Sequence, residues 1–410
     1  MWSSLMHGKE RVCGFVRRHR KLVVATGVTA VCGAGVYYAY RRVMGEAERF
    51  TQQLQRQMAE HQRLQLSVAS TTEESNATIH RFLPKLRKTL FALVNLEEIV
   101  AALKALPKAQ RAKRNELWED AKITAVTRYF TALIAFGVWH LLVFAQISII
   151  GKRTFERSKD KDKDKAAGRS NDEAADAARM AAQHAFLASG LEYFLDEGLE
   201  RIKKHVEQAV VANEQLQSWE VNSKLKVDRE ELNDLLQSIY LSIVPSTSVA
   251  GTAIDEEDDA KWAMWRSFLI YSEKKAGQDE EVISLLNDLW DLLDSELFPP
   301  ALQQSLAFLC GNAFQDLNEH VYGYTEHKML VEDVTNEQDT AKKAPPLAKL
   351  IPMLQTEIGK LLTATNASDG QPSYSRKYSQ GLGELEAFRN FYEAIFFQHA
   401  DEGDVISQFI

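Results

Sequence analysis

The residues that could do chemistry in this chain do not combine into a recognisable catalytic or metal-binding motif. The sequence contains no G-x-S-x-G, no glycine-rich phosphate loop ending in Lys, no H-E-x-x-H and no cysteine pair at zinc spacing. Two of its scattered histidines, His184 and His320, fall within helical patterns, where a histidine is more often a surface or core residue than a ligand. We therefore expect no catalytic residue, no metal and no cofactor, and interpret the chain as a binding scaffold.

The cysteines and the charge balance narrow the class of protein further. Cys13, Cys32 and Cys310 lie far apart, which is typical of neither a disulfide framework nor a metal site and suits a reducing compartment. The net charge of −8 makes nucleic acid an unsuitable partner.

One segment, residues 103–118 with the sequence LKALPKAQRAKRNELW, has the composition of a binding surface. It holds five bases with no acid before Glu116, and apolar side chains flank them. The bases are Lys104, Lys108, Arg111, Lys113 and Arg114, and the apolar residues are Leu103, Leu106, Leu117 and Trp118. An apolar patch rimmed by positive charge suits an acidic amphipathic helix laid into a groove. The indole would exclude water, and the bases would mainly raise the association rate. The alternative is a core tryptophan at a helix start beside a solvated basic loop, and the residues alone leave both readings open.

Two helices must position that segment. Asn95 with Glu98 three residues later is a capping pattern for a helix over Leu96–Leu106. A second helix begins at about Asn115 and leads into Tyr129–Ile150, which lacks Lys, Arg, Asp and Glu. This run is long enough to span a membrane, but its polar residues also suit a buried core helix, and the pattern does not decide between them.

An N-terminal run of nineteen uncharged residues, Leu22–Tyr40, predicts a transmembrane anchor. Arginines flank it on both sides, and its length matches a bilayer core of roughly 30 Å. A cleaved signal peptide is less favoured because the run is long and is closed by Arg41 and Arg42. The basic tail over residues 1–21 would stay in the cytosol by the positive-inside rule.

The remaining chain predicts an all-α fold, because Gly and Pro are sparse and no convincing β pattern is present. Residues 41–410 would form one helical domain around a long apolar central helix. We expect a helix start at Thr71 and Thr72, a kink or restart at Pro84, and a final helix from Leu382 to about His399. The expected connections are a low-complexity linker at 156–178, an acidic loop at 246–260, and loops at 332–346 and 363–381.

Several blocks together resemble the peroxin-3 family of peroxisome biogenesis factors. The most specific is ELWEDAKITAVTRYF with its apolar continuation to QISIIGKRTF, and PPLAKLIPMLQTEIGKL follows later. Supporting pieces are FLPKLRKTL, SGLEYFLDEGLERIKKHVEQAV and FRNFYEAIF, and the resemblance covers most of the chain in order.

The resemblance implies a non-enzymatic docking receptor, anchored in the peroxisomal membrane by one N-terminal span, with a helical domain in the cytosol. It implies that this domain binds the acidic N-terminal amphipathic helix of peroxin-19, that Tyr129–Ile150 is a buried central helix, and that the short basic tail points into the organelle. The implied partner groove contains Trp118, Leu103, Lys104, Leu117 and Arg114, with Lys113 as a rival for Arg114 and Lys349 as a weaker member.

The other interpretation is a multi-span membrane scaffold of another organelle, in which Tyr129–Ile150 is a second span. Inheritance or turnover factors are further possible partners that the family resemblance suggests.

Overall fold

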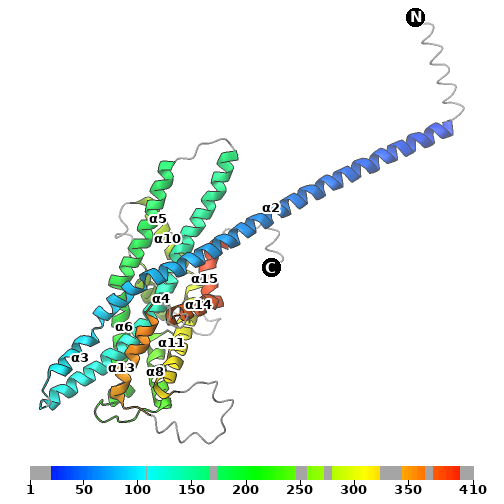
Figure 1. Ribbon diagram of the computed structural model, residues 1–410. Coiled ribbons are helices and arrows are strands. Elements are labelled where there is room, and N and C mark those ends of the chain that lie inside the picture. The colour runs from blue at the N-terminus through cyan, green and yellow to red at the C-terminus, as the bar shows by residue number, and fades with distance from the viewer. Residues whose placement is uncertain are drawn as a thin grey trace, which may run out of the picture. The chain divides into compact units, whose positions relative to one another are not determined.

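Every regular element in the part of the chain that the structure describes is a helix (Figure 1). The structure is a computed structural model, and it describes residues 20–107, 109–166, 173–245, 256–271, 279–323, 344–364 and 373–397. The predicted all-α class is therefore confirmed over these ranges. The helices are α2 (Arg20–Leu93), α3 (Leu96–Ala105), α4 (Arg111–Ala166), α5 (Glu173–Tyr193), the π-helix η1 (Phe194–Gly198), α6 (Leu199–Ala212), α7 (Glu214–Ser218), α8 (Arg229–Ile243), α9 (Glu256–Leu269), α10 (Glu280–Asp294), α11 (Phe298–Tyr322), α13 (Leu347–Leu361), α14 (Tyr374–Glu384) and α15 (Glu386–Phe397).

The chain divides into two units. The first comprises Met1–Gln65 with Gly403–Ile410, and its described part is the N-terminal stretch of α2; the second is Leu66–Glu402. The backbone of the predicted anchor, Leu22–Tyr40, is helical, but its side chains lie outside those that the structure describes, as does most of the basic tail.

Side-chain caps set several of the helix ends. The Asn95 carboxamide oxygen accepts the backbone N–H of Glu98 at 3.1 Å, which confirms the predicted start of α3. Asp228 and Glu231 form a capping box at α8, and the Asp279 carboxylate caps α10. Gly323 ends α11: it has φ 67°, a left-handed conformation that glycine adopts without steric cost.

Helix α4 forms the centre of the second unit. All residues from Ala125 to Ile149 are buried, because α3, α5, α6, α10, α11, α13 and α15 pack around this helix. Among the described residues it is the one helix long and apolar enough to cross a membrane, and 94% of its most apolar window lies inside the protein. The predicted buried central helix is thus confirmed, and its environment favours a core role over a second span.

Two of the polar residues inside this apolar run, His140 and Gln146, form hydrogen bonds within the fold, whereas the buried hydroxyls of Thr131 and Ser148 have no hydrogen-bond partner there. The His140 ring nitrogens lie 2.6 Å from the Phe136 carbonyl oxygen and 2.8 Å from the Ser379 hydroxyl. The Gln146 amide donates to the carbonyl of Phe186 at 3.1 Å. These bonds offset the cost of removing polar groups from water.

The helix boundaries differ from expectation in α2. This helix runs unbroken through Thr71 and Pro84. Pro84, which removes one backbone N–H donor from the helix, is solvent-exposed. The start predicted at Thr71 and the restart predicted at Pro84 therefore do not occur.

Helical structure also extends into the predicted connections. Helix α4 continues through the Lys-Asp repeat to Ala166, and α5 begins at Glu173. An ion pair between Lys161 and Asp176 joins the two helices there, which gives this charged stretch a partner that its composition did not reveal. Likewise, α9 begins inside the predicted acidic loop, and α14 begins inside the predicted loop at 363–381. Helix α15 lies within the predicted last helix, which α14 overlaps only at its end.

Candidate functional site

The predicted binding residues gather around the hairpin of α3 and the start of α4. Leu103 and Lys104 lie in the last turns of α3, whereas Lys113, Arg114, Leu117 and Trp118 lie in the first two turns of α4. The turn between the helices is tight, since backbone bonds join Leu106 to Ala102 and Arg114 to Gln110. The sequence-predicted segment is thus one structural element.

Burial separates these residues into a floor and a rim. Leu103 is only 6% exposed and belongs to the core, whereas Leu117 and Trp118 pack against the core and remain partly open to solvent. Lys104 and Lys113 are exposed at the rim. This half-buried state of Trp118 is what a docking role requires, because a sealed indole could not meet a partner.

Arg114 and Lys113, the two rival bases, occupy different environments. Arg114 is partly buried, and its guanidinium lies 3.5 Å from the carbonyl oxygen of Leu106, across the hairpin turn. Lys113 is exposed. Arg114 therefore helps to shape the turn, and Lys113 is the freer of the two to meet an acidic partner.

Two polar residues of the W-E-D-x-K block, Glu119 and Lys122, join the start of α4 to another part of the chain. The Lys122 ammonium, 2% exposed, donates to the carbonyls of Leu216 and Trp219 at 2.9 and 2.7 Å. It also lies 2.7 Å from Glu119, whose other oxygen accepts the N–H of Val221 at 2.8 Å. This pair ties α4 to α7 and the chain after it. We did not assign either residue from sequence, although an acid and a base three apart on a helix were a signal available to us.

Arg128 forms a second polar junction, further along α4. Its fully buried guanidinium donates to Val94 O at 2.7 Å, to both oxygens of Glu97 and to Gln355 Oε1 at 2.6 Å. It also stacks over the Phe91 ring at 4.5 Å. One side chain thereby joins the end of α2, the first turn of α3, and α13.

Helix α13 brings Lys349, the weakest of the predicted site residues. Lys349 is exposed in the first turn of α13, beside the buried Leu347 and Leu350. Those leucines, with Lys122 and Val126, are among the residues that line an apolar cavity of about 20 Å³ below the surface. Helix α13 thus packs on α4 near the end of α4 that carries Trp118. Among the described residues, no hydrogen bond or ion pair joins the Lys349 side chain to the basic hairpin.

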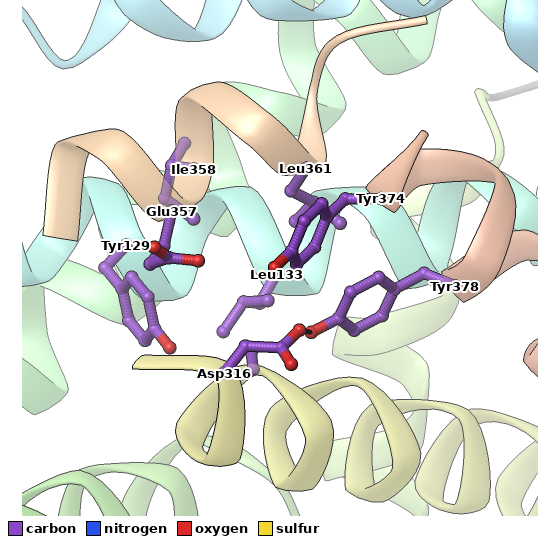
Figure 2. Close-up of a pocket in the computed structure, with 9 residues that line it drawn as sticks. Tyr129, Leu133, Asp316, Glu357, Ile358, Leu361, Tyr374 and Tyr378 are labelled. Carbon is purple, nitrogen blue, oxygen red and sulfur yellow. Dashed lines mark hydrogen bonds between the residues drawn. The ribbon is translucent and has the colours of Figure 1, made fainter. Parts of the chain in front are cut away.

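A second polar cluster lies deeper, between α4, α11, α13 and α14 (Figure 2). The Tyr378 hydroxyl donates to Asp316 at 2.5 Å, and Glu357 lies 2.5 Å from His320 and 2.8 Å from Lys360. Burial and the adjacent Asp316 raise the pKa of Tyr378. The cavity among these residues measures about 10 Å³, which is room for roughly one water molecule. We interpret this cluster as part of the structural core, not as a ligand site.

Within the described ranges, no group of three or more His, Cys, Asp or Glu side chains is placed to hold a metal ion. The fold and the hairpin surface therefore define a helical protein that presents a partly exposed aromatic patch with a basic rim.

Comparison with known proteins identifies the family. The profile of the Peroxin-3 family matches residues 104–397 of this chain. Peroxisomal biogenesis factor 3 of Bos taurus is 25% identical over 395 residues, and that of Homo sapiens is 25% identical over 401 residues. The Mus musculus protein of the same name is 24% identical over 399 residues. Each comparison covers 93% of this chain and 96% of the relative. The chain belongs to the Peroxin-3 family, and this membership gives it a role in peroxisome biogenesis.

Proposed function

We propose that this chain is a single-span peroxisomal membrane protein that docks peroxin-19 on the α3–α4 hairpin. In this proposal Leu22–Tyr40 crosses the membrane, and the helical domain faces the cytosol. Docking of peroxin-19 then delivers newly made membrane proteins to the peroxisome. The proposal rests on the family, on the anchor-like N-terminal run and above all on the surroundings of Trp118.

The observation that carries the proposal is the partial burial of Trp118 at the head of α4. An aromatic side chain seated on a packed core loses little conformational freedom when a partner covers it, and its remaining exposed surface is removed from water. Leu117 lies beside it on the same helix and is also partly open. Together they offer the apolar contact that an amphipathic helix needs.

The charges around this patch suit an acidic partner. Lys104 and Lys113 are exposed, and Arg114 is partly exposed, on the two helices that flank the turn. Exposed bases of this kind attract an acidic helix over about a Debye length and so mainly raise its association rate. Lys349 on α13 would extend the positive rim if the partner helix continues toward α13.

The experiment is a fluorescence titration of a labelled peptide carrying the acidic N-terminal helix of peroxin-19. For the Trp118→Ala variant we expect binding to weaken by about 2 kcal/mol or more, which is roughly thirty-fold in Kd, because buried aromatic anchors typically contribute that much. Trp290→Ala is the matched control, since Trp290 is also partly buried against the core but lies on α10.

Circular dichroism of both variants should show helical content equal to the unmodified protein. Unchanged affinity in the Trp118→Ala variant, or an equal loss in the Trp290→Ala variant, would overturn the assignment of the hairpin as the docking site.

A further inference from the structure

Arg128 is a buried cation with no place in the proposed docking surface, yet it joins the helices that build that surface. It lies ten residues beyond Trp118 on α4, about 15 Å along the helix axis. Its donors reach the last turn of α2, the first turn of α3, and α13. A charge this deeply buried needs a structural reason, because apolar residues of similar volume would often stabilise a core as well or better.

Helix α3 depends on such an anchor. With ten residues it is too short to be stable on its own. Leu96 and Leu103 bury its apolar side, and the bidentate contact with Arg128 fixes its first turn through Glu97. The predicted contact residues Leu103 and Lys104 lie in the last turns of the same helix, so any rotation or shift of α3 moves them.

The two-sided contact distinguishes Arg128 from an ordinary ion pair. One guanidinium nitrogen donates hydrogen bonds both to Glu97 at 2.8 Å and to Gln355 at 2.6 Å. Helices α3 and α13 are therefore bonded to the same atom of α4. Leu117, Ala121, Thr124 and Arg128 recur at three- and four-residue spacing and therefore share one face of α4. The face fixed by Arg128 thus continues toward the hairpin surface.

We propose that Arg128 is the positioning residue of the docking surface: through Glu97 and Gln355 it holds α3 and α13 in register on α4, so that a partner helix meets a pre-formed site. The proposal rests on the docking function proposed above. It predicts that loosening the Arg128 contact weakens docking although the contact lies far from the partner.

Glu97→Ala tests this without opening a cavity in the core, because the Glu97 side chain is 64% exposed, and Arg128 keeps its hydrogen bonds to Val94 and Gln355. Glu98→Ala is the matched control, since it removes an equal charge from the same first turn of α3 and also the hydrogen bond that Glu98 accepts from the Asn95 carboxamide, but does not touch Arg128. Any larger effect of Glu97→Ala is therefore due to the Arg128 contact. We expect the peptide of the docking assay to bind Glu97→Ala roughly five-fold more weakly than Glu98→Ala, with faster dissociation. Glu97→Gln, which still accepts hydrogen bonds, should fall between the Ala variant and the unmodified protein.

Hydrogen exchange without peptide provides the readout that separates positioning from general stability. Amides of α3 should exchange faster in Glu97→Ala than in Glu98→Ala, whereas amides of the buried part of α4 should not change. Equal affinities and equal α3 exchange in the two variants would overturn the inference. If instead the unmodified protein fails to bind the peptide, the docking function fails, and faster α3 exchange in Glu97→Ala would still support the anchoring of α3 by Arg128.

Discussion

At the residue scale, the indole of Trp118 combines two properties that usually exclude each other. Packing against the core holds the ring in one position, and partial exposure leaves a face for a partner. The cost of ordering this side chain is therefore met when the protein folds and need not be met again on binding. The exposed bases of the hairpin are not held in one position by packing. They should therefore affect mainly the association rate of a partner, and this effect should weaken as the salt concentration rises.

His140 connects the stability of the domain to pH. Burial lowers the pKa of its imidazole to about 3, against the opposing effect of the hydrogen bond with the Phe136 carbonyl. In the neutral ring, Nδ1–H donates to that carbonyl, and Nε2 lies 2.8 Å from the hydroxyl oxygen of Ser379. The pKa of the nearby His80 is also lowered, by burial and by Arg376, and the charge of His80 lowers the pKa of His140 further.

The resulting prediction concerns acid destabilisation. Between the ordinary pKa of about 6.5 and the folded value of about 3, the unfolded chain binds a proton that the folded chain excludes, so stability is lost as the pH falls. His140 alone should cost about 2 kcal/mol between pH 7 and pH 5. Urea unfolding of His140→Gln should show a shallower pH dependence over this range. His184→Gln, at an exposed position, is the control, and equal slopes in the two variants would contradict the mechanism.

The site residues differ in how far the sequence could predict them. The exposed bases and Trp118 were visible because charge and aromatic residues cluster within one short segment. Arg128 was not, since its acidic partner lies 31 residues before it and Gln355 lies 227 residues after it. A hydrophobic pattern shows only that such a residue interrupts an apolar face, and not which distant groups will satisfy it.

At the element scale, local chemistry predicted some helix boundaries and not others. Asn95 caps a helix as its spacing to Glu98 indicates, and in the structure Asp228 and Asp279 also cap helices, whereas the start expected near Thr71 does not occur. Pro84 and the Lys-Asp repeat misled the same reasoning, because solvent exposure at one and pairing with α5 at the other allow the helix to continue. Both effects depend on tertiary surroundings that a local pattern does not contain.

The π-helix η1 gives a testable contrast between two glycines. A Cβ at Gly198 would lie 2.4 Å from the carbonyl oxygen of Phe268, so η1 and α9 approach more closely than any larger residue permits. Gly198→Ala should destabilise the domain by about 1–3 kcal/mol despite the better helix propensity of alanine. At Gly311 in α11 no atom beyond the surrounding helix backbone lies within 4 Å of the place that a Cβ would take, so Gly311→Ala should stabilise the domain by about 0.5–1 kcal/mol. Urea midpoints of the two variants, moving in the same direction, would contradict this account.

At the scale of the whole molecule, the burial of α4 predicts how the chain behaves without its anchor. A protein of residues 41–410 should be soluble without detergent and monodisperse in gel filtration, with the helical circular dichroism spectrum of the full chain, because the Tyr129–Ile150 run is already covered by protein. The full chain should require detergent if Leu22–Tyr40 is a membrane span. Aggregation of the shorter protein that only detergent reverses would favour the two-span interpretation instead.

The overall class could be predicted, but the neighbours of each helix could not. Composition and the missing β pattern indicated an all-α chain, and Tyr129–Ile150 was recognised as its longest apolar stretch. Periodicity left open whether lipid or protein covers that stretch, because both surroundings select the same residues. Only the packing of seven other helices around α4 distinguishes them.

The central position of α4 has a consequence for synthesis. The last helices that cover it, α13 and α15, begin at Leu347 and Glu386, about two hundred residues after the apolar run leaves the ribosome. During that interval the growing polypeptide carries an exposed apolar segment, because the helices that cover it in the folded protein have not yet been made. A ribosome stalled before α13 should therefore hold a nascent chain that binds general chaperones strongly, and premature stop codons in this region should yield products that are degraded and do not accumulate as partial domains.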